Sequence, residues 1–414
     1  MKIYYLLGSD KNGCLDLGDI YYFDNNSTTL IYDDETKEEM IKWLSCGNPS
    51  NTLHKLGRMS HNKIESCRSI VAKKFKVVPE EIYFTSGATE SNNIICQGVI
   101  KNCLDKNPKK SFSVITTAFE HSSVINIFKH YENEFKRLEV IYVNPCKDKD
   151  DSDYGVIKLK DVEEAIKNAK NKVVLISIMH ANNETGAIQN INEIGKVAHK
   201  NNIFLHSDMT QSAGKFDIDP YKLNVDSFSF SGHKFHGPKG VGCLFIRKDI
   251  DKCKCLCYGG EQESHFRPGT ENLANIAGIT TALMKVHENR IEKNEKMHKL
   301  KQKIINGLSN NLDFMVLGPT DSNKVLPNTI LGLFKDIDSD NRKIVEEMDK
   351  RNIFVSVGSA CQTESKTGSH VLESMDIDFD DRNKVIRISL SDYNTNEEAD
   401  YLIENLTEII KNQK

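Results

Sequence analysis

Val225-Asp-Ser-Phe-Ser-Phe-Ser-Gly-His-Lys234 decides the fold, because an apolar strand ends there in a tight turn that carries a lysine. Residues 225–230 are typical of a buried strand, and Gly232 starts the turn. A lysine on a rigid turn can be held against a bound carbonyl compound, whereas an ordinary lysine is solvated. Asp208, at the end of the preceding apolar run, favours the first interpretation.

Six further apolar runs alternate with segments of helical periodicity. They are residues 82–85, 113–117, 139–143, 173–178, 203–207 and 241–246. Strands separated by helices predict an α/β fold with a seven-stranded, mainly parallel sheet covered on both faces. Ligands of such sheets bind at the carboxyl ends of the strands. Polar side chains fall at five of these ends, namely Ser86, His121, Asn183, Asp208 and Lys234.

A glycine lies between small hydroxyl residues in Ser86-Gly87-Ala88-Thr89, after a predicted strand and at the start of a predicted helix. The free N–H groups and the dipole of a helix N-terminus bind anions. We therefore expect an anion to bind at Gly87, Ala88 and Thr89. Plain N-capping by Ser86 or Thr89 is the alternative.

Length and composition limit the remaining function classes. The 414 residues exceed what a single core supports, so we expect two domains. The net charge is −4 and the lysines and arginines are spread out, which argues against nucleic-acid binding. Eleven cysteines and no secretory signal predict free thiols in a reducing, cytoplasmic compartment. The apolar runs are shorter than the ~18 residues of a membrane span.

Several ordered motifs resemble one known family. Tyr22-Phe-Asp-Asn-Asn-Ser-Thr-Thr29, the Ser86 to Asn92 run and the Lys234 turn resemble the fold-type I pyridoxal phosphate (PLP) enzymes of the class-V aminotransferase family, and Gly358-Ser-Ala-Cys361 resembles the NifS/IscS-type cysteine desulfurases within it. The resemblance implies a large PLP-binding domain, residues 22–272, and a smaller α/β domain formed by residues 1–21 and 273–414.

The resemblance also implies the residues that hold the cofactor. Lys234 would hold PLP covalently, Asp208 would face the pyridine nitrogen, His121 would stack on the ring, and Gln211 would bind its phenolate oxygen. The implied phosphate ligands are Gly87, Ala88, Thr89, Ser231 and His233, with Thr270 reaching the site of a neighbouring subunit in a homodimer. Asn183 would bind the cofactor beside its phenolate oxygen and would also bind the substrate carboxylate. Arg387 would bind the same carboxylate through its planar fork.

Cys361 determines the implied reaction. By resemblance its sulfur attacks the sulfur of L-cysteine, leaving L-alanine and a persulfide that supplies iron–sulfur clusters or other thio-cofactors. The polar run from Gln362 to Ser369 is unlike a packed core, which favours a nucleophile over an apolar filler. A thiol with a pKa of about 8.5 is only partly ionised at neutral pH, so it needs a proton acceptor, for which His121 is the candidate.

Other functions stay open at this point. A selenocysteine lyase or another PLP-dependent class-V enzyme would not need Cys361, and a catalytically inert interaction scaffold would need no cofactor.

Relatives dock iron–sulfur scaffold proteins with a C-terminal tail, but this chain stops at Lys414 and carries Ser391-Asp392 where relatives often carry Gly-Arg. Docking of a sulfur-acceptor or scaffold protein therefore stays open as well.

Two further segments carry structural expectations. Cys253, Cys255 and Cys257 alternate, which is typical of half-buried thiols on one face of a strand. A zinc site built from thiolates would need cysteines paired with two residues between them, so we expect no metal.

After Asn272 the pattern predicts one long helix to about Leu308 that leads into the smaller domain.

Overall fold

A computed structural model of the chain describes residues 2–6, 14–248, 253–254, 257–335, 337, 340–358 and 368–412. Two compact units are present. The large unit comprises Thr29–Asn182 and Ala187–Arg290, and the small unit comprises Met1–Thr28, Asn183–Gly186 and Ile291–Lys414. The predicted domain limits, after residues 21 and 272, stay a prediction.

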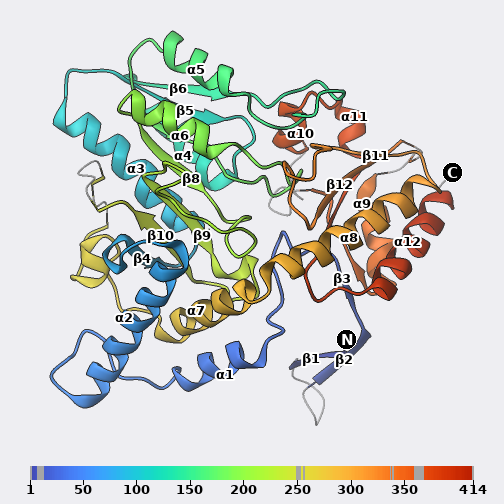
Figure 1. Cartoon of the computed structure of the whole chain (residues 1–414), viewed down its shortest axis with the longest axis horizontal. Coiled ribbons are helices and arrows are strands. Elements are labelled where there is room, and N and C mark those ends of the chain that lie inside the picture. Colours follow the sequence, from blue (N-terminus) through green and yellow to red (C-terminus); the bar gives the residue numbers. More distant parts are fainter. Residues whose placement is uncertain are drawn as a thin grey trace. The chain divides into compact units, whose positions relative to one another are not determined.

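The large unit is built on a seven-stranded sheet (Figure 1). Its strands, in order across the sheet, are β4 (Ile82–Thr85), β10 (Gly242–Ile246), β9 (Ser227–Ser231), β8 (Phe204–Asp208), β7 (Lys172–Ser177), β5 (Phe112–Thr117) and β6 (Leu138–Val143). β10 pairs antiparallel with β4 and with β9, and the other pairs of these strands are parallel. All seven strands lie within a few residues of the predicted positions, so the predicted α/β class is confirmed.

Helices cover both faces of this sheet, so its central strands are buried throughout. The helices of the large unit are α1 (Asp34–Lys42), α2 (Lys55–Phe75), α3 (Ala88–Lys106), α4 (Ser122–Glu134), α5 (Leu159–Asn168), α6 (Ile191–Lys200) and α7 (Leu273–His287), with the short helices η1 (Pro79–Glu81), η2 (Gly232–Lys234) and η3 (Gln262–His265). One apolar cluster joins α3 and α4 to the sheet and includes Ile95, Phe128 and Phe204.

The small unit has its own core. Its strands are β1 (Lys2–Leu6), β2 (Cys14–Asp19), β3 (Tyr21–Tyr22), β11 (Phe314–Val316), β12 (Thr329–Phe334), β13 (Ile353–Phe354) and β14 (Val385–Ser389), and its helices are α8 (Arg290–Ser309), α9 (Asn341–Asp349), α10 (His370–Ser374), α11 (Phe379–Arg382) and α12 (Asn396–Lys411). An antiparallel sheet has the order β11-β12-β14. Ile304 of α8, Ile388 of β14 and Leu406 of α12 belong to one buried cluster, so helices and sheet pack together.

Two sequence expectations about secondary structure are wrong. The helix after Asn272 does not run unbroken to Leu308, because Glu288 is extended and Asn289 has a φ of 52° between α7 and α8. Asparagine tolerates this left-handed conformation better than most residues. Cys253 and Cys257 lie in no strand, while Cys255 is outside the described residues.

None of the helices in the described ranges combines the length and apolar character that a membrane span requires.

Candidate active site

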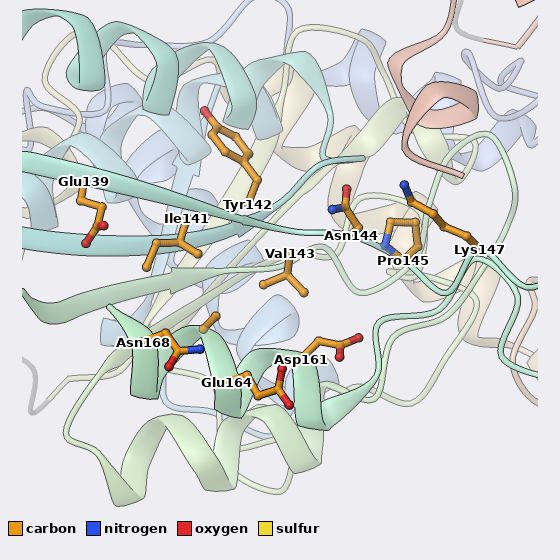
Figure 2. Close-up of a pocket in the computed structure, with 11 residues that line it drawn as sticks. Glu139, Ile141, Tyr142, Val143, Asn144, Pro145, Lys147, Asp161, Glu164 and Asn168 are labelled. Atoms are coloured by element: carbon orange, nitrogen blue, oxygen red, sulfur yellow. The ribbon is translucent and has the colours of Figure 1, made fainter. Parts of the chain in front are cut away.

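Figure 2 shows a pocket of about 550 Å³ between the edge strand β6 and α5. Ile141 and Val143 point toward α5, and Tyr142 points to the other side of the strand. None of the residues predicted to bind a cofactor or substrate lines this pocket. The candidate site of the large unit lies instead where β4, β8 and β9 end.

Gly87 forms the turn between β4 and α3. Its φ of 155° favours glycine, and an added Cβ would lie 3.2 Å from the hydroxyl oxygen of Ser231. Ser231 ends β9, and its hydroxyl accepts a hydrogen bond of 2.7 Å from the backbone N–H of Ala88. The structure thus brings Gly87, Ala88 and Ser231 together at the N-terminus of a 19-residue helix. Thr89 follows and is exposed.

Asp208 ends β8 and is only 6% exposed. Its carboxylate accepts a hydrogen bond of 2.8 Å from the side-chain amide of Asn92 and one of 2.9 Å from the backbone N–H of Thr210. Hydrogen bonds to the ionised form stabilise a buried carboxylate. The two donors therefore hold the Asp208 carboxylate in place at the carboxyl end of the parallel strands.

Asn92 is a site residue that the sequence did not reveal. Besides Asp208, its amide donates to the hydroxyl of Ser123 at 3.0 Å. Its carbonyl oxygen accepts from the hydroxyl of Ser229 at 2.5 Å and lies 3.0 Å from Nε2 of His206. Burial keeps the pKa of His206 well below its ordinary value, so the imidazole is neutral at pH 7. All four hydrogen-bonding positions of the Asn92 amide are used.

His121 caps the N-terminus of α4 and connects to the same network. Its Nδ1 accepts a hydrogen bond of 3.1 Å from the backbone N–H of Ser123 and lies 2.8 Å from the hydroxyl of that residue. A neutral ring that accepts at Nδ1 carries its proton on Nε2. His121 and Thr89 also line one pocket of about 420 Å³.

Lys234 ends η2, directly after β9, and is half-buried. The carbonyl of Gly232 accepts backbone hydrogen bonds from Phe235 at 3.1 Å and from Gly237 at 3.0 Å, which makes the turn rigid. His233 precedes the lysine, and its pKa is lowered to about 3 by burial and by the nearby charges of Lys234, Lys239 and His121. The imidazole of His233 is therefore neutral at physiological pH.

Gln211 lies in the loop after Asp208 and is 4% exposed. The same loop continues to Ser212, whose hydroxyl lies 3.0 Å from Nδ1 of His180. Burial lowers the pKa of His180 to about 4, so this ring stays neutral and supports the loop. Gln211 therefore lies in the loop that begins directly after Asp208, the last residue of β8.

Asn183 and Arg387 belong to the small unit, where the structure brings them together. Arg387 lies on β14 and is 1% exposed. Its Nη1 donates to the carbonyl of Asn183 at 3.2 Å, and its Nη2 donates to the carboxylate of Asp24 at 2.8 Å and to the hydroxyl of Ser27 at 2.6 Å. A buried guanidinium is thus held by a carboxylate, which is the group that its fork binds best.

Thr270 is exposed, at the end of a loop whose start is anchored inside the large unit. Glu263 of this loop accepts hydrogen bonds of 2.7 and 2.8 Å from the guanidinium of Arg68, and one of 2.8 Å from the backbone N–H of Phe84 on β4. The loop is therefore tied to the strand that leads to Gly87. The predicted nucleophile, Cys361, lies outside the described residues.

The residues of the large unit suit PLP. Gly87 leaves room where a Cβ would approach Ser231, the buried Asp208 carboxylate can pair with a protonated ring nitrogen, and Lys234 offers an amine on a rigid turn. Groups of three or more His, Cys, Asp or Glu side chains that could hold a metal ion are absent from the described residues.

The model of the class-V aminotransferase family matches residues 21–402. The chain belongs to the class-V aminotransferase family. A cysteine desulfurase IscS of Clostridium botulinum (strain Hall) is 34% identical over 396 residues, covering 95% of either chain. A solved structure described as a NifS-like protein is 37% identical with a TM-score of 0.83, covering 95% of this chain and 100% of that one. A structure of SspA in complex with cysteine is 30% identical with a TM-score of 0.75, covering 91% of this chain and 100% of that one.

These relatives place the chain among the NifS/IscS-type members of the class-V family, as its motifs predicted. The fold type I that the resemblance implied is likewise confirmed. The Ser86 to Asn92 run, by contrast, did not indicate a role for Asn92. The signal that would have found it is a polar residue among the mainly apolar buried positions of α3.

Proposed function

We propose that this class-V enzyme is a PLP-dependent cysteine desulfurase. The proposed reaction converts L-cysteine and the Cys361 thiol into L-alanine and a Cys361 persulfide. The Cβ–S bond of the substrate breaks, a new S–S bond forms, and hydrogen replaces sulfur on Cβ, so no external oxidant or reductant is needed. The observation that carries the proposal is the 34% identity to a cysteine desulfurase over 95% of both chains, together with a buried Asp208 held by Asn92.

The residues of the large unit would hold the cofactor. Asp208 would keep the pyridine nitrogen protonated, Gln211 would bind the phenolate oxygen, and Lys234 would form the covalent link. The proposed phosphate ligands are Gly87, Ala88, Thr89, Ser231 and His233, completed by Thr270 from a second copy in a homodimer. When bound, PLP supplies an electron sink for carbanion chemistry.

Two residues would bind the substrate carboxylate. Arg387 offers a buried guanidinium whose Nη1 already donates to the carbonyl of Asn183. Its Nε is buried and lacks a hydrogen-bond partner among the described residues, so the side chain retains a donor. We propose that this donor and the Asn183 amide orient L-cysteine through its carboxylate.

Lys234 and His121 would move protons. Lys234, once released from the cofactor, would take the α-proton of the substrate. His121 accepts at Nδ1 from Ser123, which leaves its Nε2–H as a donor in the neutral ring. Nδ1 therefore carries the lone pair of the neutral ring. We propose that His121 accepts the thiol proton of Cys361 at this nitrogen and becomes imidazolium, which can then return a proton.

The proposed partners are L-cysteine, a second copy of this chain, and a protein that accepts the persulfide sulfur for iron–sulfur cluster assembly or another thio-cofactor. We propose a cytoplasmic location, because 11 cysteines, an odd number, favour free thiols in a reducing compartment.

The test measures L-alanine formed from L-cysteine in the presence of a thiol reductant. Wild-type protein should form alanine and sulfide, and Cys361→Ser should lose both while it keeps the visible absorbance of bound cofactor. Lys234→Ala should lose the absorbance of the lysine-linked cofactor. Undiminished sulfide release by Cys361→Ser would overturn the desulfurase proposal, and turnover of L-selenocysteine alone would favour the lyase.

A further inference from the structure

Glu184 is a buried acid of the small unit that the proposed chemistry does not use. It lies in the short segment Asn183–Gly186 and is 1% exposed. Its Oε2 accepts a hydrogen bond of 2.6 Å from the hydroxyl of Ser369. The same oxygen would lie 3.2 Å from a Cβ added to Gly358. The carboxylate oxygen therefore bonds to Ser369 and lies beside the open side of Gly358, eleven residues earlier in the sequence.

Gly358 and Ser369 flank the segment that carries Cys361. Gly358 has a φ of 103°, which only glycine adopts without strain, and its open side faces the Glu184 carboxylate. Ser369 is the N-cap of α10, and its hydroxyl oxygen accepts from the backbone N–H groups of Val371 at 3.1 Å and Leu372 at 3.3 Å. The donor to Glu184 is thus itself fixed by the helix that follows.

The segment before Gly358 is anchored to the proposed carboxylate site. Ser356 and Arg387 exchange two backbone hydrogen bonds, of 3.1 and 2.7 Å. Arg387 in turn donates to the carbonyl of Asn183, the neighbour of Glu184. Burial raises the pKa of Glu184, and the hydrogen bond from Ser369 and the charges of His370 and Arg387 oppose that rise.

We propose that Glu184 is a positioning residue for Cys361, in that its carboxylate fixes the points where the chain enters and leaves the segment with the nucleophile. The inference rests on the proposed function only for the role of Cys361. Ser369 supplies the hydrogen bond on one side, and Gly358 leaves the space that the carboxylate occupies on the other. Loss of the carboxylate removes the tether without touching the residues proposed to hold PLP.

The experiment compares Glu184→Ala with wild-type holoenzyme. The first readout is the rate at which iodoacetamide alkylates Cys361, resolved by peptide mass spectrometry and extrapolated to the high-pH limit, where the thiolate fraction no longer matters. The second is trypsin cleavage after Lys366. Both rates should rise at least three-fold, while kcat falls about ten-fold and KM for L-cysteine stays within two-fold.

Three controls separate positioning from loss of stability. Glu184→Gln keeps a hydrogen-bond acceptor and should stay within two-fold of wild type in both rates. Ser374→Ala removes a buried hydroxyl that bonds to the carbonyl of Val371 in the same helix at 2.7 Å, and it should change neither rate. Alkylation of the exposed Cys46 should be equal in all variants.

Unchanged or slower alkylation and cleavage in Glu184→Ala would overturn the proposal. If Glu184→Ala does not fold, the same two rates are measured in Ser369→Gly. This variant removes the other partner of the hydrogen bond to Glu184, and glycine is tolerated at the N-cap of a helix. Neither accessibility readout needs turnover of L-cysteine. A wild-type protein that forms no alanine would therefore contradict the proposed function and leave this result standing.

Discussion

The side-chain amide of Asn92 donates a hydrogen bond of 2.8 Å to the carboxylate of Asp208. Asn92 belongs to α3, the helix whose N-terminus is the proposed phosphate site, and Asp208 ends β8. The same amide reaches Ser123, the partner of His121. One residue thereby sets the distance between the groups proposed to hold the phosphate, the ring nitrogen and the ring face.

Asn92→Ala should weaken cofactor binding and stability together. The substitution leaves the buried Asp208 carboxylate with the backbone donor of Thr210 and removes a partner of His206. Leaving buried polar groups unsatisfied costs about 1–3 kcal/mol in free energy of unfolding. Urea titration measures that loss, and equilibrium dialysis measures the release of PLP. Asn107→Ala, at the far end of the same helix, should change neither.

The fold was predictable because its signals are local. Each of the seven strands is a short apolar run, and the Gly87 turn is marked by glycine between small residues. The break between α7 and α8 was missed, since Asn289 adopts its left-handed conformation inside a stretch of good helix formers.

The supporting contacts of the site were not predictable from the sequence. Asn92 and Asp208 are 116 residues apart, and Glu184 and Ser369 are 185 residues apart. Neither pair can be recognised from a periodic pattern in the sequence, because the tertiary fold determines which partner a single buried polar residue meets. The motifs indicated the groups proposed to touch the ligand, and the structure added the groups that orient them.

Arg68→Met should lower the free energy of unfolding by about 3–5 kcal/mol, because it leaves the buried Glu263 carboxylate without its charged partner. The two side chains are 11% and 2% exposed. Glu263 also begins three consecutive residues with positive φ, of 47°, 53° and 67°, which the ion pair holds in place. A urea titration of Arg68→Met against wild type gives the difference.

Two controls test the Arg68 prediction. Arg58→Met changes an exposed arginine of the same helix and should cost less than about 1 kcal/mol. The double variant Arg68→Met with Glu263→Gln should recover part of the loss, because it no longer buries an unpaired charge. Additive losses in this cycle would contradict a coupled pair.

Arg387→Lys should raise KM for L-cysteine about 10- to 100-fold, because a lysine cannot offer the fork that a carboxylate accepts. The variant also loses part of the contact with Asp24, which is now 2.8 Å from Nη2. Steady-state kinetics of alanine formation supply KM. Arg382→Lys changes an arginine that bonds to the carbonyl of Ile377 at 2.9 Å, and its KM should equal that of wild type.

Lys301 should make the stability of the protein rise with pH between about 8 and 10.5. It is 3% exposed on α8, its amine donates to the carbonyl of Leu326 at 3.0 Å, and burial lowers its pKa from 10.5 to about 8. Between these two values the unfolded chain binds more protons than the folded one, so deprotonation favours folding as the pH rises. The shift corresponds to about 3 kcal/mol.

Lys301→Met isolates this effect, because methionine fills a similar volume without a charge. The free energy of unfolding of wild type minus that of Lys301→Met should increase by about 3 kcal/mol as urea titrations move from pH 7.5 to pH 10.5. Lys303→Met, two residues on, replaces a lysine that pairs with Asp400 at the surface, and its difference from wild type should stay flat over the same range. A flat difference for Lys301→Met as well would mean that the buried amine keeps its ordinary pKa, because Leu326 and its surroundings then stabilise the charge as well as water does.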